Sequence, residues 1–182
     1  MKALVVYESM FGNTEKVARA IADGLWDTYD VTLAEVSSMP IATGVDLLVV
    51  GGPTHAFGMS RPSSREQAAQ QGTVRPDAVA VGVREYLDCS PPLRGMPAAA
   101  FDTKIDKPFL PGSAARRVQR QLRRLGCRTV LPAQSFLVKR TAGPLAEKEE
   151  TRARKWGAAL ASATHLVHPA QEAHREGSSR VD

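Results

Sequence analysis

The chain has 182 residues, of which 43% are hydrophobic and 24% charged, and its net charge at pH 7 is +5. These values are typical of a globular protein with one domain and one buried core. The apolar runs are far too short to span a bilayer, and the N-terminal run ends at Glu8 with no cleavage pattern after it, so we predict a cytoplasmic protein without a membrane span.

The first predicted unit is a strand, a polar loop and a helix. Lys2–Tyr7 is short, apolar and rich in β-branched residues, which is typical of a buried strand. Ser9–Asn13 forms the loop, and an amphipathic helix begins at Thr14. Loop N–H groups and the positive end of the helix dipole converge there, and Gly12 can adopt a positive φ. The unit predicts a site for the phosphate of a nucleotide or flavin, although the same residue types also serve as ordinary helix caps.

The next part of the chain predicts two strands and a long loop. Val31–Val36 alternates as a strand does, and Asp46–Val50 is the strongest strand pattern in the sequence. It leads into Gly51–Pro62, a loop of glycines and prolines at the carboxyl end of a strand, where α/β proteins place their sites. A short helix or turn is predicted for Ser63–Gln71, and a helix for Pro76–Asp88.

A fourth strand is predicted at Pro97–Phe101, where small apolar residues end in Asp102-Thr103-Lys104. The loop Ile105–Gly112 follows it. Ser113 is predicted to cap the next helix, which runs to Arg124 and is terminated by Gly126.

The end of the chain predicts one more strand and helix. Thr129–Val138 is the last strand, and Pro132 inside it indicates an edge position or a bulge. Glu147 begins a final helix that runs to about Thr164. Residues 166–182 are polar and lack periodicity, so we predict a disordered tail after a single domain at 1–165.

Five β-then-α units predict a parallel sheet with helices on both faces. Three families with this layout fit poorly. A Rossmann domain needs G-x-G-x-x-G, and the first loop has only Gly12. A P-loop NTPase needs G-x-x-x-x-G-K-[ST], but Gly52–Gly58 is one residue too long and no lysine follows. A response-regulator receiver needs acidic residues after strands one and three, and Glu8 stands alone.

The cysteines and histidines exclude several kinds of site. Cys89 and Cys127 lie far apart, outside any C-x-x-C spacing, and the four histidines show no paired-ligand spacing. No metal cluster, iron–sulfur centre or disulfide framework is therefore expected. Any redox chemistry must come from a bound organic cofactor.

Three motifs resemble those of the flavodoxin family. Val5-Val6-Tyr7-x-Ser9-x-x-Gly12-x-Thr14-x-x-x-Ala18-x-x-Ile21 resembles its FMN-phosphate signature. Gly52-Pro53-Thr54 resembles its second flavin loop, and Phe101-Asp102-Thr103-Lys104 stands where the third should be. The family is the type example of a doubly wound sheet with strand order 2-1-3-4-5 and FMN at the β1/β3 switch point. The resemblance, which spans about 1–165, therefore implies a flavodoxin-like α/β fold with five parallel strands in this order and FMN as cofactor.

The resemblance also implies which residues contact FMN. They are Ser9, Met10, Phe11, Gly12, Asn13 and Thr14 around the phosphate, Pro53, Thr54, His55, Ala56, Phe57 and Gly58 along the ribityl chain and one side of the ring, and Asp102, Thr103 and Lys104 at the pyrimidine edge. The flavin carries the chemistry in this fold, so no catalytic residue is assigned. Lys104 either stabilises negative charge on the reduced flavin or is a solvated lysine.

Some features differ from those of electron-carrier flavodoxins. Phe11 replaces the usual threonine, and an aromatic residue there resembles flavodiiron modules and FMN-dependent quinone reductases. No tyrosine follows Asp102, which leaves Phe109 as the aromatic candidate. We therefore keep three hypotheses: electron transfer between redox partners, an NAD(P)H or quinone oxidoreductase, and a non-catalytic flavin-binding or basic interaction module.

The chain is basic where carrier flavodoxins are usually acidic, and five arginines crowd the helix 114–124. No aromatic residue is interleaved with them, so nucleic-acid binding is not expected, and the simplest interpretation is a solvated face. Around the expected flavin, four cations outnumber three acids: Arg61, Arg65, Lys104 and Lys107 against Asp102, Asp106 and Glu66. We therefore expect a basic docking surface that receives an acidic redox partner.

Overall fold

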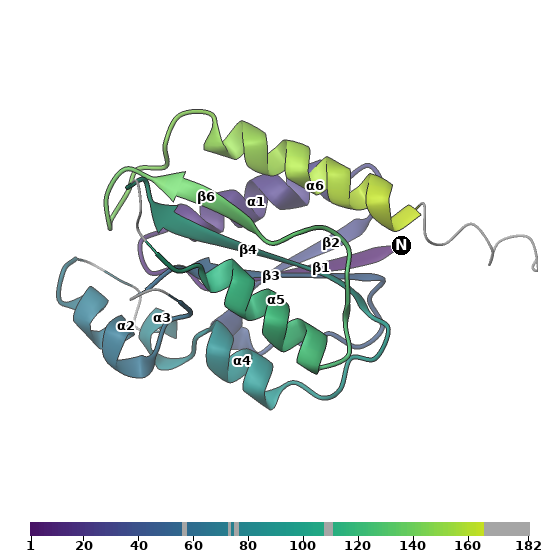
Figure 1. The fold of residues 1–182 in the computed structure, drawn as a ribbon, viewed down its shortest axis with the longest axis horizontal. Helices are drawn as coiled ribbons and strands as arrows, with labels where there is room; N and C mark the ends of the chain where they lie inside the picture. The colour runs from purple at the N-terminus through teal and green to yellow at the C-terminus, as the bar shows by residue number, and fades with distance from the viewer. Residues whose placement is uncertain (56–57, 73, 75–76, 108–110, 166–182) are drawn as a thin grey trace, which may run out of the picture.

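A parallel β-sheet crosses the middle of the molecule and is covered by helices (Figure 1). The computed structural model describes residues 1–55, 58–72, 74, 77–107 and 111–165. Its elements are, in order, β1 (Lys2–Tyr7), α1 (Asn13–Leu25), β2 (Asp30–Glu35), the short 3-10 helix η1 (Val36–Ser38), β3 (Leu47–Pro53), α2 (Pro62–Ala69), α3 (Asp77–Ala80), α4 (Val83–Cys89), β4 (Pro97–Ile105), α5 (Ala114–Arg124), β5 (Arg128–Thr129), β6 (Gln134–Val138) and α6 (Glu149–His165). The predicted tail lies outside the described residues.

The strand order is β2-β1-β3-β4-β5, with every pair parallel, which confirms the predicted order 2-1-3-4-5. The predicted last strand, Thr129–Val138, is divided into two pieces that both pair with β4. β5 pairs with the beginning of β4, whereas β6 pairs with its end, where Ile105 lies opposite Val138. Pro132 lies in the gap between the pieces, because proline has no N–H to donate to a strand ladder.

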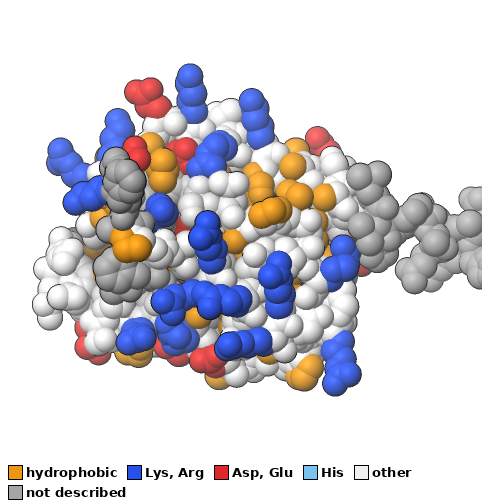
Figure 2. All heavy atoms as spheres, viewed as in Figure 1, with side chains coloured by type: hydrophobic (Ala, Val, Ile, Leu, Met, Phe, Trp, Pro, Cys, Tyr) orange, Lys and Arg blue, Asp and Glu red, His pale blue; other side chains and the backbone are white. Residues whose placement is uncertain are grey.

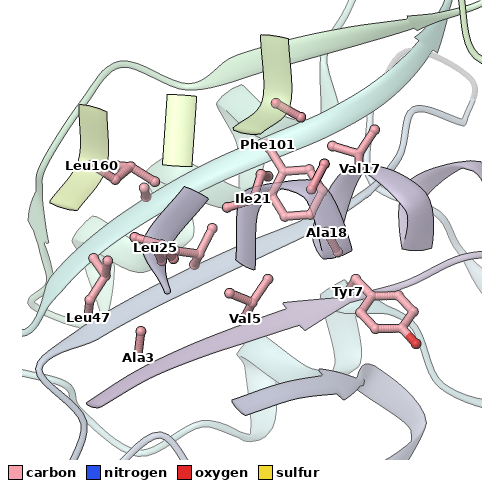
Figure 3. Packing of buried hydrophobic residues seen from close by; sticks show 14 of the residues in the cluster. Ala3, Val5, Tyr7, Val17, Ala18, Ile21, Leu25, Leu47, Phe101 and Leu160 are labelled. Carbon is pink, nitrogen blue, oxygen red and sulfur yellow. The ribbon is translucent and has the colours of Figure 1, made fainter. Parts of the chain in front are cut away.

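Helices cover both faces of the sheet, as predicted. In Figure 1, α1 and α6 lie on one face, whereas α4 and α5 lie on the other. Side chains alternate along each strand, so Val5 packs against α1 and α6 while its neighbours Leu4 and Val6 join the opposite core. Figure 3 shows Val17, Ile21 and other side chains of α1 packed against β1 in the first core. Burial on both faces explains why the strands are continuously apolar.

Helices α1 and α6 approach each other through two glycines. A Cβ built at Gly24 would lie 2.1 Å from the carbonyl oxygen of Arg154. One built at Gly157 would lie 2.3 Å from that of Ile21 and 3.2 Å from the Cα of Gly24. The backbones therefore contact each other directly, and no larger residue fits at this crossing.

The predicted helix Pro76–Asp88 is instead two short helices, α3 and α4, and the expectation of one helix was wrong. The break falls at Gly82, which is extended and caps α4, and its N–H donates to Glu85 Oε2 at 2.9 Å. A Cβ there would lie 2.4 Å from Arg65 Nη1 and 2.8 Å from Glu8 Oε2. A buried polar cluster therefore occupies the space that a continuous helix would need.

Three further observations concern the described residues only. None of their helices is long and apolar enough to cross a membrane. No group of three His, Cys, Asp or Glu side chains among them lies close enough to hold a metal ion. Both cysteines are free thiols: Cys89 is exposed, whereas burial raises the pKa of Cys127 to about 11.

Candidate functional site

The carboxyl ends of β1, β3, β4 and β6 open onto one cleft of about 70 Å³. We call it the central cleft. Its lining comes from segments far apart in the sequence: Ser9, Met10, Phe11, Asn13, Thr14, Pro53, Thr54, His55, Thr103, Lys104, Ile105, Val138 and Thr141. Ligands of doubly wound sheets bind at this edge, because neighbouring crossovers diverge there and leave a crevice.

Residues 9–14, the phosphate loop, connect β1 to α1. Gly12 precedes the helix with φ 81° and ψ −8°, in the left-handed region. A Cβ built there would meet nothing within 4 Å, so the backbone conformation rather than space requires glycine. Ser9 Oγ accepts a hydrogen bond from Glu15 N–H at 3.3 Å, which leaves its own hydroxyl proton available to donate.

The phosphate loop presents five consecutive backbone N–H groups, from Met10 to Thr14, that have no acceptor among the described residues. Met10, Asn13 and Thr14 are buried, and a buried donor without a partner costs about 1–3 kcal/mol. A phosphate group would accept hydrogen bonds from such donors and would be attracted by the positive end of α1. The loop therefore fits the phosphate of a nucleotide or flavin.

Thr103 joins the three predicted segments of the site. Its Oγ1 lies 2.8 Å from Thr14 Oγ1 in a buried hydrogen bond between the phosphate loop and β4. Its carbonyl oxygen accepts a hydrogen bond from Thr54 N–H at 2.8 Å, which ties β4 to the segment after β3. The strands extend further than predicted because Gly52 and Pro53 of β3 pair with Asp102 and Thr103. Asp102 and Thr103 thus belong to β4 rather than to a loop.

Asp102 does not line the central cleft, although the resemblance places it at the flavin. It is fully buried, and its Oδ2 accepts hydrogen bonds from Thr54 Oγ1 at 2.9 Å, Ser113 Oγ at 2.7 Å and Ala115 N–H at 2.9 Å. Thr54 Oγ1 in turn accepts from Ala114 N–H at 2.9 Å. We call this group the Asp102 clamp. It fastens the carboxyl ends of β3 and β4 to the N-terminus of α5, where Ser113 is the predicted cap.

His55 and Gly58 form a tight turn in which each N–H donates to the other's carbonyl oxygen, at 2.9 and 2.8 Å. Ala56 and Phe57, which stand between them in the sequence, lie outside the described residues, as does Phe109. The His55 side chain lines the central cleft, with Nδ1 3.3 Å from Ser64 Oγ. Burial lowers the pKa of His55, which favours the neutral ring, and a neutral ring offers one donor and one acceptor.

Phe11 anchors the phosphate loop to the α2 region. It packs against a small apolar cluster formed by Met10, Ala68 and Ala78. Gly72 makes room for its ring, because a Cβ there would lie 3.1 Å from Phe11 Cε1. The aromatic residue is thus compatible with the loop geometry that phosphate binding needs.

Several residues of the central cleft were not predicted. Ile105, Val138 and Thr141 line it. Gly143 lies close to the cleft residue Asn13: a Cβ built on Gly143 would be 2.5 Å from Asn13 Oδ1. The Gly143-Pro144 pair after the last strand is typical of a loop, and loops at this edge of the sheet often carry binding residues. This pattern could have predicted the additional lining. Of the remaining predicted residues, Gly12 borders an adjoining hollow and Gly58 lines a separate cavity.

Arg65 is fully buried, which corrects its assignment to the docking surface. Its Nε donates to Val79 O at 2.8 Å, and its Nη1 lies 3.1 Å from Glu85 Oε2. Glu8 is buried beside it and accepts a hydrogen bond from Val83 N–H at 2.8 Å. Burial raises the pKa of Glu8, and the nearby Arg65 guanidinium only partly opposes this shift. This buried cluster joins α2 and α4 to Glu8, which directly precedes the phosphate loop in the sequence.

The comparisons with known proteins agree on one family. A family model described as flavodoxin matches residues 5–156. A flavodoxin from the domain Archaea has a TM-score of 0.64 and 23% identity, covering 91% of this chain and 99% of that one. Flavodoxin 1 from Bacillus cereus has a TM-score of 0.64 and 19% identity, covering 89% and 98%. The Flv1 flavodiiron core from Synechocystis has a TM-score of 0.60 and 15% identity, with 92% of this chain matched to 36% of that one. Comparison with curated protein sequences gives no significant match.

Proposed function

This chain belongs to the flavodoxin family, and we propose that it holds FMN in the central cleft and transfers electrons between redox partners. FMN is the cofactor of the family. The observation that carries the proposal is the phosphate loop, whose five N–H groups just before and at the start of α1 have no acceptor among the described residues. A phosphate monoester matches this donor set in both charge and hydrogen bonding.

Other residues of the central cleft would hold the rest of the cofactor. Thr103 and Lys104 at the end of β4 line the cleft together with Pro53 and His55, and Pro53 is the strand partner of Thr103 in the sheet. Backbone and hydroxyl groups on this lining suit the polar ribityl chain and ring edge, and Lys104 brings a cation to the ring. FMN supplies one- and two-electron redox chemistry when bound, whereas the protein supplies orientation and electrostatic tuning.

We further propose that the redox partner is acidic at its docking face. Arg61 and Lys107 are exposed near the cleft and Lys104 is half-buried, against the exposed acids Glu66 and Asp106. Burial removes one cation and one acid, Arg65 and Asp102, from the set first expected, so the balance stays basic. Such a surface attracts an acidic partner over a range set by the salt concentration.

The test is a titration of the purified protein, first with FMN and then with reductant. We expect one FMN per chain with a perturbed flavin absorbance spectrum, and electron transfer to a one-electron protein acceptor. Failure of the protein to bind FMN would contradict the proposal. Fast oxidation of NAD(P)H with a quinone, without a protein acceptor, would instead support the oxidoreductase hypothesis.

A matched pair of variants locates the cofactor. Ser9→Ala removes a hydroxyl from the phosphate loop, whereas Ser38→Ala removes one from η1, where it donates to Glu35 O. We expect about tenfold weaker FMN binding for Ser9→Ala, since a hydrogen bond to a charged group contributes about 1.5–3 kcal/mol, and no change for Ser38→Ala. Equal effects of the two would contradict the assignment of this loop.

A further inference from the structure

A second cavity of about 620 Å³ lies beside the central cleft, on the other side of His55. We call it the arginine cavity. It is bounded by His55, Gly58 and Met59 after β3, by one side of α2, and by side chains of α4 and α5. Its lining residues are His55, Gly58, Met59, Arg61, Ser63, Ser64, Glu66, Gln67, Gln70, Arg84 and Arg117.

The charges in the arginine cavity are unbalanced. Arg61 precedes α2, Arg84 belongs to α4 and Arg117 to α5, so three separate segments bring guanidinium groups to one space. Among the described residues, Glu66 is the only acidic one that lines the cavity. Neither Arg61 nor Arg117 forms an ion pair with any described residue. Like charges that converge without partners repel each other, and an anion would relieve the repulsion.

Arg84 is fixed by hydrogen bonds, and Arg117 lies close to the backbone of Gly58. Arg84 donates from Nε to Ser60 O at 3.2 Å and from Nη2 to Met59 O at 3.3 Å, which fixes its guanidinium at the cavity wall. Arg117 passes directly over Gly58, where a Cβ would lie 2.4 Å from its Nε. Glycine at position 58 therefore makes room for Arg117 to lie against the turn. Arg84 is held in place by these hydrogen bonds, which reduces the entropy cost of binding a ligand there.

The rest of the lining is polar and suits a phosphorylated molecule. Ser63 and Ser64 offer hydroxyls, and Gln67 and Gln70 offer amides on the same side of α2. The volume lies within the range of small-molecule sites, about 300–1,000 Å³. Guanidinium groups bind phosphate with paired hydrogen bonds, whereas an uncharged quinone would gain little here.

We propose that the arginine cavity binds the pyrophosphate group of a nucleotide-sized ligand, through Arg61, Arg84 and Arg117. This inference goes beyond the proposed electron transfer and does not depend on it, because His55 is the only described residue that lines both the cavity and the central cleft. A ligand held here would contact a residue that also lines the cofactor cleft. Its binding should therefore be visible in the flavin spectrum.

The test is isothermal titration of the FMN-loaded protein with inorganic pyrophosphate and with ADP, at constant ionic strength. We expect one site per chain for both probes and a change in flavin absorbance on binding. Arg117→Gln and Arg61→Gln should each weaken binding about tenfold or more, as expected for a lost charge-assisted hydrogen bond. Arg117→Lys keeps the positive charge but loses the paired N–H donors of the guanidinium, so its affinity for pyrophosphate should be intermediate.

Arg120→Gln is the matched control, because Arg120 is exposed on the same helix but does not line the cavity. It should bind pyrophosphate like the unmodified protein. An equal loss in Arg120→Gln would overturn the proposal in favour of diffuse attraction to α5. So would the absence of saturable binding at millimolar pyrophosphate, or binding of an acidic peptide but not of either probe.

The same titration without FMN separates this inference from the proposed function. If the chain fails to bind FMN yet binds pyrophosphate with the expected sensitivity to Arg117→Gln, the cavity proposal stands and the electron-transfer proposal falls. If FMN binds and pyrophosphate does not, the reverse holds. The two proposals can therefore fail independently.

Discussion

Gly12 is the residue on which the phosphate loop depends most directly. Because its φ of 81° is unfavourable for other residues, Gly12→Ala should lower the free energy of unfolding by about 1–2 kcal/mol. Relief of that strain would also redirect the loop N–H groups, so FMN affinity should fall. Gly44→Ala is the control, with φ 80° and equally open space. Urea unfolding should show similar losses for both variants, and unchanged FMN affinity in Gly12→Ala would contradict the role of the loop.

Glu8 gives the protein a pH-dependent contribution to stability. Burial raises its pKa above 4.5, so between 4.5 and the raised value the native state keeps a proton that the unfolded state releases. The contribution of Glu8 to the free energy of unfolding therefore falls as pH rises through this window. Glu8→Gln removes the titrating group and keeps an acceptor for Val83 N–H.

Urea unfolding between pH 4 and pH 8 tests this point. The stability of Glu8→Gln relative to the unmodified protein should increase as pH rises through the window. Glu66→Gln, which changes an exposed side chain, is the control. A stability difference for Glu8→Gln that is constant across this range would refute the prediction.

At the scale of elements, the close contact between α1 and α6 leads us to expect the opposite effect of a Gly→Ala change on stability from the one that helix propensity predicts. Alanine is favoured over glycine inside a helix by about 1 kcal/mol. Gly157→Ala should nevertheless destabilise, because its Cβ would overlap backbone atoms of α1, and overpacking costs about 1–3 kcal/mol or more. Gly24→Ala on the other helix should behave alike. An increase in thermal stability of either variant would show that the helices can separate without cost.

The Asp102 clamp also connects separate elements, because one carboxylate accepts hydrogen bonds that hold β3, β4 and α5 together. Asp102→Ala removes the acceptor for two hydroxyls and one N–H, so it should cost about 3 kcal/mol or more. Asp102→Asn should cost less, because its oxygen can replace Oδ2 while its amide takes the position of Oδ1, which has no partner among the described residues. Equal losses in urea unfolding would mean that the charge, not the acceptor, matters.

For the whole molecule, the proposal of an acidic partner rests on the distribution of charge. Figure 2 shows Lys and Arg side chains gathered over α5, whose five arginines are all exposed. Electron exchange with an acidic protein partner should slow by about tenfold or more between low and high salt, because screening removes the attraction. Stopped-flow measurement of flavin oxidation follows the rate, with a neutral small acceptor as control. A rate that is unaffected by salt would contradict an acidic docking partner.

Local patterns in the sequence predicted much of this fold. The β1–loop–α1 unit, the apolar third strand and the Ser113 cap depend on neighbours within one turn or one strand. The strand order followed from the resemblance of these motifs to the flavodoxin signature, and the observed sheet confirms it. The phosphate loop likewise combines residues that are adjacent in the chain, so most of its geometry could be predicted.

Contacts between distant residues decided the rest. Glu8 meets Val83 and Arg65 only after folding, so neither the break in Pro76–Asp88 nor the burial of an arginine was visible in local periodicity. Asp102 turns toward α5 because Ser113 and Ala115 offer donors there. The sequence by itself determined the periodicities, the caps and the phosphate loop. The tertiary structure decided which polar side chains are buried together and which arginines share a cavity, because burial and charge pairing depend on segments that only the fold brings together.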